Sequence, residues 1–147
     1  MQFDVSKNAN PLEASERERI IANPTFGTHF TDHQVVITWE KDKGWHSAQV
    51  IPYGPIMMDP SSAVLHYGQE IFEGIKAYRH EDGSIWTSRP DMNATPLQRS
   101  AKRLALPELP AEIFLDSLRL LFPLLGDVLP PPQRQHTLFI RPFAIPP

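Results

Sequence analysis

The densest group of residues that could do chemistry runs from Tyr67 to Gly74 and reads Tyr-Gly-Gln-Glu-Ile-Phe-Glu-Gly. It combines two aromatic rings, two glycines, an amide and two carboxyl groups within one short segment. The glycines lack the spacing of a phosphate-binding loop. Because aromatic side chains dominate core burial, residue type alone predicts that Tyr67 and Phe72 lie in the hydrophobic core.

Two other patterns are typical of catalytic or metal sites, and both are weak. His29 and His33 are four residues apart, as two metal ligands on one helix would be. Gly27 and the threonines beside these histidines disfavour a helix, so we predict no metal site there. The chain has no Gly-x-Ser-x-Gly motif, and Ser61-Ser62 is typical of the entrance to a helix or turn. The absence of cysteine excludes disulfides and thiolate chemistry.

The composition is that of one ordinary globular domain. The chain has 147 residues, 41% of them hydrophobic and 21% charged, with a net charge of −3. Opposite charges are interspersed, so neither a nucleic-acid partner nor an anionic membrane surface is expected. Met1–Asn10 lacks the apolar segment of a signal peptide, and the apolar stretch 118–125 is too short to span a bilayer, so we expect a cytoplasmic protein.

The first half of the chain predicts two hairpins after a polar lead-in. A short helix is expected at 14–21. The segment 33–39 is rich in β-branched residues and predicts a strand. A turn at 41–44 and a second extended segment at 45–52 complete the first hairpin. A second pair, 75–79 and 85–87, flanks an Asp-Gly turn. A short helix is expected between the hairpins, around 69–72.

The second half predicts two helices and a final strand. After Pro90 an apolar face recurs at helical spacing, formed by Leu97, Ala101, Leu104 and Ala105, and Pro107 and Pro110 are expected to stop this helix. A second helix is expected at 111–125, kinked or shortened by Pro123. Its apolar face is formed by Phe114, Leu118, Leu121, Phe122 and Leu125. The prolines 130–132 form a stiff connector to a strand at 137–143. These elements predict an α+β fold.

Several segments together resemble the branched-chain amino acid aminotransferases, the class IV pyridoxal-phosphate enzymes. Leu65–Arg79, which contains the Tyr67–Gly74 group, is similar to the signature stretch of that family. Four other segments have counterparts in the same order and spacing: 26–33, 51–55, 100–107 and 140–143. The resemblance covers about residues 20 to 143.

The resemblance implies amino transfer between leucine, isoleucine or valine and 2-oxoglutarate, with pyridoxal phosphate as the cofactor. By motif match, Phe30, Tyr67 and Phe72 line the apolar site for the substrate side chain. Arg141 belongs to a Tyr-x-Arg-Pro element that recognises the carboxylate of the glutamate-type substrate, a task that suits a guanidinium. Members of the family are dimers whose small domains contribute to each other's pockets.

The chain departs from the family pattern at sites that matter for function. The tyrosine of the Tyr-x-Arg-Pro element is Phe139 here, so its hydroxyl is lost. The family's phosphate-binding arginine falls on Pro96, which brings neither charge nor donor. Arg99 is the nearest replacement, but we expect it on a different face of the helix. The segment 122–135 also drifts from the pattern and fills with proline, and the chain has 16 prolines in all.

The cofactor-holding lysine of the family has no counterpart among Lys7, Lys41, Lys43, Lys76 and Lys102. By resemblance that lysine lies beyond residue 147, in a large domain. We therefore expect an N-terminal arm at 1–30 and a truncated two-layer small domain of the class IV fold at 31–147, incomplete at its C-terminal end. No catalytic residue is expected in this chain, and it is expected to be inactive alone. Two alternatives stay open: a non-catalytic partner subunit of a lysine-bearing chain, and a non-functional product of a disrupted gene. As partners we expect a second copy of this chain or a full-length subunit.

Overall fold

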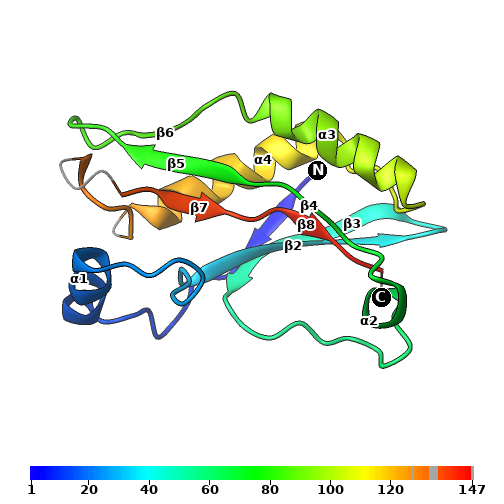
Figure 1. Ribbon diagram of the computed structural model, residues 1–147, viewed down its shortest axis with the longest axis horizontal. Coiled ribbons are helices and arrows are strands. Elements are labelled where there is room, and N and C mark those ends of the chain that lie inside the picture. The colour runs from blue at the N-terminus through cyan, green and yellow to red at the C-terminus, as the bar shows by residue number, and fades with distance from the viewer. Residues whose placement is uncertain (127, 133–135, 147) are drawn as a thin grey trace.

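A computed structural model describes residues 1–126, 128–132 and 136–146, and it has a mixed α+β architecture (Figure 1). In the described part of the chain, no helix has the length and apolar character needed to cross a membrane. The elements follow in the order β1 Phe3–Val5, α1 Ala14–Ala22, β2 His33–Glu40, β3 Gly44–Pro52, α2 Ala63–Tyr67, β4 Ile71–Phe72, β5 Ile75–Arg79, β6 Ile85–Thr87, α3 Asp91–Arg103, α4 Ala111–Leu121, η1 Phe122–Leu125, β7 Leu138–Ile140 and β8 Phe143–Ala144.

Strands β1, β3 and β2 form the first sheet, in that order. The predicted hairpin is confirmed, since β2 and β3 pair antiparallel from His33 opposite Pro52 to Glu40 opposite Gly44. The predicted helix at 14–21 is confirmed by α1. Strand β1 was not predicted. It pairs parallel with β3, so part of the lead-in joins the sheet.

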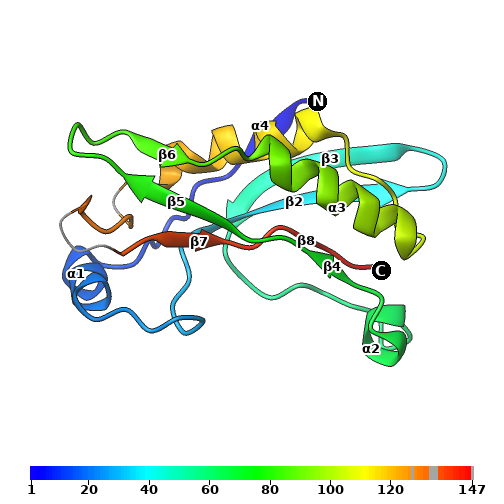
Figure 2. The same ribbon diagram turned by 45° about the horizontal axis from the view of Figure 1, so that its top comes forward.

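A second group of strands forms one continuous ribbon. β5 pairs with β6, which confirms the second hairpin, and also with β7. β4 pairs with β8, with Ile71 opposite Ala144. This pair continues the register of β5 and β7, in which Ile75 is opposite Ile140. The segments 71–77 and 138–144 therefore run side by side across the molecule (Figures 1 and 2). The predicted final strand is present but is divided at Arg141–Pro142.

Helices α3 and α4 pack against one face of this ribbon. The core joins Ile71 and Ile75 of the ribbon to buried residues of both helices, among them Leu97 and Phe114. The other buried residues of this cluster are Ala94, Ala101, Leu106 and Leu118. Pro123 shortens the second helix as predicted, because α4 gives way to a 3₁₀ turn, η1, at Phe122.

Two helix ends differ from the prediction, and both involve left-handed backbone. The prediction of a helix around 69–72 is wrong. The helix α2 ends at Tyr67, Gly68 takes φ +59°, and Ile71–Phe72 forms strand β4. The predicted places of Leu104 and Ala105 on a buried helix face are also wrong. Ala105 has φ +56° and α3 ends before it. The amide of Leu106 donates to the Ala101 carbonyl at 2.8 Å, and that of Ala105 donates to Lys102, which together form a Schellman cap.

The Ala105 position gives a stability test. A left-handed alanine carries steric strain that glycine lacks, so Ala105→Gly is expected to raise the free energy of unfolding by about 1 kcal/mol. Ala22→Gly is the matched control, an exposed alanine at the end of α1 without positive φ, and it is expected to lower stability. Urea unfolding measures both. Equal losses in the two variants would show that the cap is not strained.

Candidate functional site

The candidate site lies at the break in the ribbon, where Pro142 is opposite Glu73. The Glu73 amide donates to the Pro142 carbonyl at 2.8 Å. In an antiparallel pair the amide of residue 142 would donate to the Glu73 carbonyl in return, but proline has no N–H, so this bond is missing. The Glu73 carbonyl instead accepts a long hydrogen bond from Arg141 Nη1 at 3.4 Å. The break therefore brings the Arg141 side chain back onto its neighbouring strand.

Two aromatic rings hold the Arg141 guanidinium. Its central carbon lies 4.5 Å from the centroid of the Phe72 ring and 4.7 Å from that of Phe139. Each contact is a cation–π interaction, which stabilises the charge without consuming its N–H donors. Arg141 is exposed, and within the described ranges it has no carboxylate partner. We call Phe72, Arg141 and Phe139 the arginine stack. Its free donors suit a planar anion such as a carboxylate.

Three further residues surround the arginine stack, and sequence reasoning did not single them out. Phe26 meets the Phe139 ring edge-on, with centroids 5.4 Å apart. Gly74 lies beneath the Phe139 ring, so closely that an added Cβ would be 2.8 Å from Cζ. Asn93, from the first turn of α3, donates to the Glu73 carboxylate at 3.0 Å and to the Gly74 carbonyl at 3.3 Å. The Arg-Pro-x-x-Asn sequence that ends at Asn93 was the available signal for it.

The other two expected substrate residues have ring partners outside the arginine stack. The Phe30 ring stacks on Tyr53 with centroids 5.1 Å apart. Tyr67 ends α2, and its ring has an edge contact with His66. Between described residues, no hydrogen bond, ring pair or cation–π contact joins Phe30 or Tyr67 to Arg141. The prediction of core positions is wrong for Tyr67 and Phe72, which are 85% and 58% exposed.

Local bonds at its entrance set the position of α2. Asp59 Oδ1 accepts hydrogen bonds from the amide and the hydroxyl of Ser61, and these bonds lower the pKa of Asp59. The Ser62 hydroxyl donates to the Pro146 carbonyl, which ties the helix entrance to the strand end after β8. Ser61-Ser62 is thus a helix entrance, as predicted.

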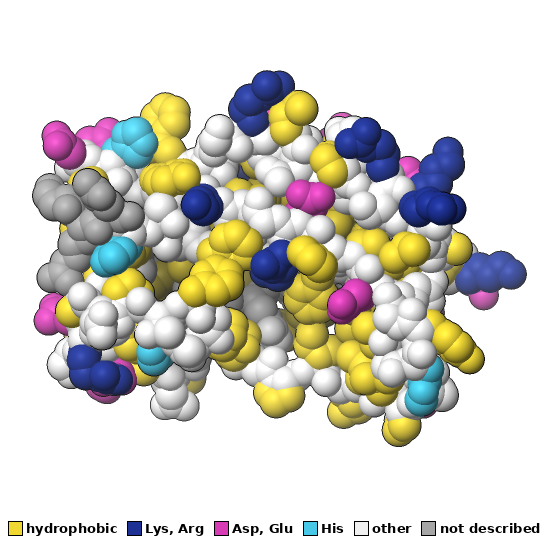
Figure 3. All heavy atoms as spheres, viewed as in Figure 1, with side chains coloured by type: hydrophobic (Ala, Val, Ile, Leu, Met, Phe, Trp, Pro, Cys, Tyr) yellow, Lys and Arg dark blue, Asp and Glu magenta, His cyan; other side chains and the backbone are white. Residues whose placement is uncertain are grey.

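Many large aromatic side chains of the described residues are exposed. Figure 3 shows hydrophobic side chains spread over the middle and lower right of this view. The exposed aromatic residues include Phe26, Phe30, Tyr53, Tyr67, Phe72 and Phe143. Exposed apolar area of this kind marks a ligand or partner surface more often than an ordinary solvated face.

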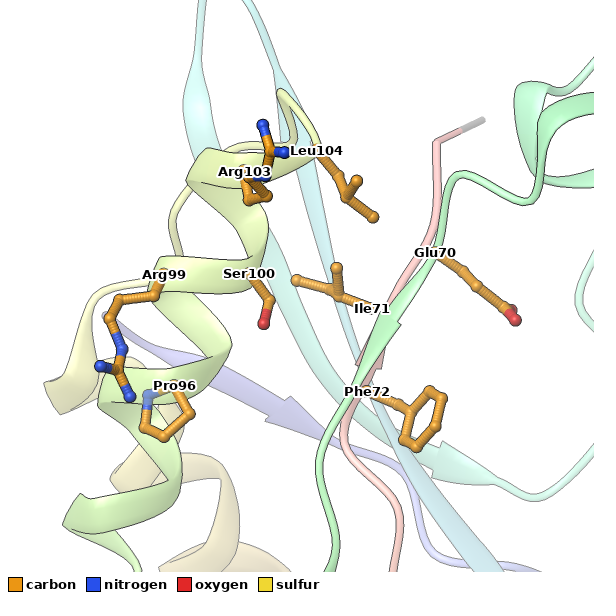
Figure 4. A pocket seen from close by; sticks show the side chains of 8 residues that line it. All are labelled: Glu70, Ile71, Phe72, Pro96, Arg99, Ser100, Arg103 and Leu104. Carbon is orange, nitrogen blue, oxygen red and sulfur yellow. The ribbon is translucent and has the colours of Figure 1, made fainter.

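A groove of about 500 Å³ separates α3 from β4 (Figure 4). Pro96, Arg99, Ser100 and Arg103 line it from the helix side. Ser100 points across it towards Ile71, and the Arg99 guanidinium lies beside Pro96. The expectation that Arg99 lies on a different face from Pro96 is wrong, because residues three apart are neighbours on a helix. Two guanidinium groups and a hydroxyl form a donor set that suits a phosphate.

The lysines lie outside this arrangement. Lys7, Lys41, Lys43, Lys76 and Lys102 are all exposed. Lys76 is the one closest to the site, directly opposite Phe139 in the ribbon. No group of three or more His, Asp or Glu side chains is placed to hold a metal ion in the part of the chain that the structure describes. His29 lies outside any helix and His33 begins β2, in agreement with the sequence analysis.

Comparison with curated proteins shows extended homology. The chain is 57% identical over 145 residues to a branched-chain-amino-acid aminotransferase of Mycolicibacterium smegmatis, a match that covers 99% of the chain. It is 49% identical over 143 residues to the protein of that name from Mycobacterium tuberculosis. It is 45% identical over 120 residues to branched-chain-amino-acid transaminase 1 of Bacillus subtilis. No protein-family model matches the chain.

The homology covers nearly all of this chain but only part of each relative. The matches span 39% of the two mycobacterial proteins and 33% of the Bacillus protein. The chain is therefore a homologue of branched-chain-amino-acid aminotransferases over a segment that makes up about two fifths of their length.

Pro96 offers a test of the groove. Pro96→Arg is expected to strengthen the binding of inorganic phosphate about tenfold, since one charge-assisted hydrogen bond contributes roughly 1.5–3 kcal/mol. It also restores an amide to the interior of α3, which stabilises the helix. Pro96→Ala is the control, because it restores the amide without the guanidinium. Phosphate titration by NMR and urea unfolding measure the two effects, and equal phosphate affinity in both variants would contradict the role of the groove.

Proposed function

We propose that this chain forms the substrate-binding domain of a branched-chain amino acid aminotransferase, corresponding to the two-layer small domain of the class IV fold. The whole protein would transfer an amino group between leucine, isoleucine or valine and 2-oxoglutarate in the cytoplasm. Homology over 99% of the chain supports the family, and the arginine stack is the observation that supports the role.

Arg141 would receive the carboxylate of the glutamate-type substrate. The rings of Phe72 and Phe139 restrict the guanidinium, so less side-chain entropy is lost when a carboxylate binds. The loss of the family's hydroxyl at Phe139 removes one polar group but leaves the ring that contacts Arg141. Carboxylate recognition therefore depends on contacts that this chain has kept.

Phe30, Tyr67 and Phe72 would supply the apolar wall for a branched aliphatic side chain. All three rings are exposed, and they belong to three different segments of the chain. A branched aliphatic chain that covers such surface is stabilised by about 25 cal/mol for each Å² of apolar area removed from water.

The cofactor of the family is pyridoxal phosphate, which stabilises the negative charge that develops on the substrate during amino transfer. Arg99, Ser100 and Arg103 are the residues of this chain that would hold its phosphate. No lysine of the chain lies in that groove or in the arginine stack. We propose that the 147 residues alone provide binding groups and no base for the proton transfer, and therefore do not catalyse the reaction.

A non-catalytic partner role is the second candidate, and the exposed aromatic face favours it. Phe26, Tyr53 and Tyr67 are all more than half exposed, and Phe26 contacts the Phe139 ring of the arginine stack. A lysine-bearing chain of the same family is the occupant that this face would suit, because the site would then be shared between two chains. Co-purification of this chain with such a subunit, and loss of the complex in a Tyr53→Asp variant, would support this role.

The first functional prediction concerns Arg141. Titration of the 147-residue chain with 2-oxoglutarate, followed by NMR, is expected to shift resonances of Phe72, Phe139 and Arg141. Arg141→Gln is expected to reduce the affinity at least tenfold, since it removes the charge that the carboxylate pairs with. Arg119→Gln, at an exposed arginine of α4, is the matched control. The dimethyl ester of 2-oxoglutarate, which lacks both charges, should leave all three residues unshifted. Equal affinity for the acid and the ester would contradict the assignment.

The second prediction concerns catalysis by the chain alone. With pyridoxal phosphate, leucine and 2-oxoglutarate, the 147 residues are expected to form no glutamate above the rate of the free cofactor. Lys76 is the lysine to substitute in this test, because it lies opposite Phe139 in the ribbon. Glutamate formation that disappears in Lys76→Arg would show that this lysine does the chemistry and would overturn the proposal of an inactive domain.

A further inference from the structure

Beneath the arginine stack, the backbone lacks part of the hydrogen-bond ladder between the paired strands. In the stretch from Ile71–Phe72 to Ile75–Ala77, the pairing with β7 and β8 is interrupted at Glu73–Gly74. One backbone bond crosses this interruption, from the Glu73 amide to the Pro142 carbonyl. Among the described residues, the Glu73 carbonyl accepts a hydrogen bond only from Arg141 Nη1, and the 3.4 Å between the two atoms is near the outer limit for such a bond. The ladder alone therefore restrains this part of the site weakly.

Asn93 supplies the missing restraint from outside the ribbon. Its Nδ2 atom has two hydrogens and two acceptors, Glu73 Oε2 at 3.0 Å and the Gly74 carbonyl at 3.3 Å. Both contacts are to the two residues where the ladder is interrupted. Asn93 lies in the first turn of α3, which is packed against the ribbon through Ala94 and Leu97. The side chain thus fixes the interruption to a rigid element.

Gly74 supplies the space that the Phe139 ring occupies. A Cβ at this position would be 2.8 Å from Cζ and 3.1 Å from Cε2 of that ring. Contacts under 3.0 Å force a shift, so any side chain here would displace the ring that carries Arg141. Gly74 has no left-handed φ, so the need for glycine comes from this close approach and not from the backbone conformation.

We propose that Asn93 and Gly74 are positioning residues that hold the Arg141 guanidinium over Phe72 and Phe139 in the orientation that receives a carboxylate. Asn93 holds the Glu73 carboxylate and the Gly74 backbone carbonyl, and Gly74 admits the ring of Phe139. Neither residue contacts the substrate. The carboxylate part of this inference rests on the proposed function, whereas the orientation of Arg141 can be tested without any ligand.

The test uses the full 147-residue chain and two matched pairs. Asn93→Ala is paired with Gln98→Ala, which removes another amide side chain of α3, one that donates to the Leu109 carbonyl at 2.9 Å. Gly74→Ala is paired with Gly54→Ala, where an added Cβ meets nothing within 4 Å. If Asn93→Ala does not fold, Asn93→Ser replaces it, since its shorter side chain cannot reach both acceptors.

Two readouts separate positioning from stability. The side-chain NMR resonances of Arg141, displaced by the ring currents of Phe72 and Phe139, report the stack without ligand. The affinity for 2-oxoglutarate reports its function. We expect Asn93→Ala and Gly74→Ala to return the Arg141 resonances towards ordinary values and to weaken binding at least threefold. The two controls should leave both unchanged, even where thermal unfolding shows a similar loss of stability.

Each outcome decides a separate point. Unchanged Arg141 resonances in Asn93→Ala and Gly74→Ala, or equal changes in the controls, would overturn the positioning roles. If the unsubstituted chain does not bind 2-oxoglutarate, the proposed function fails while the resonances still decide whether Asn93 and Gly74 orient Arg141.

Discussion

The constraint on which the rest of the structure depends is the pairing of residues 71–77 with 138–144 in a single register. Because side chains alternate along a strand, this register places Ile71, Ile75 and Ala77 on the face that packs on the core. It places Phe72, Phe139 and Arg141 on the opposite face. A slip by one residue would exchange the two sets, so the same pairing builds the core and the site.

Local sequence patterns predicted the helices and strands better than they predicted which strands pair with one another. Both hairpins, the helices α1, α3 and α4, and the shortening at Pro123 follow from alternation, turn residues and helical spacing within short windows. The pairing of Ile75 with Ile140 joins residues far apart in the chain, and β1 pairs through three residues only, so neither leaves a local signal. The end of α3 was misplaced because Ala105, and not a glycine, takes the left-handed conformation that closes the helix.

The site was predicted in part, for reasons that lie in the same geometry. Motif resemblance pointed to Phe72, Phe139 and Arg141, which the structure brings together. Residue type alone predicted burial for Phe72 and Tyr67, and it failed because aromatic rings here occupy an exposed strand face and a helix end. The Arg-Pro-x-x-Asn sequence was a signal for Asn93, but the contacts of Phe26, Gly74 and Asn93 exist only once the ribbon and α3 are packed together.

The two anion-binding features of this face depend on different elements. The arginine stack is carried by the ribbon, and its guanidinium is held by ring contacts that do not need the hydroxyl missing at Phe139. The groove lies between α3 and β4, and Pro96 contributes neither a charge nor a hydrogen-bond donor to its lining. Asn93 is the hydrogen-bonded link between them, about two turns from Ser100 along the helix and bonded to the ribbon at Glu73. A charge introduced at Pro96 is therefore expected to act on the groove without moving Arg141, whereas a change at Asn93 would act on the stack while leaving the donors of the groove in place.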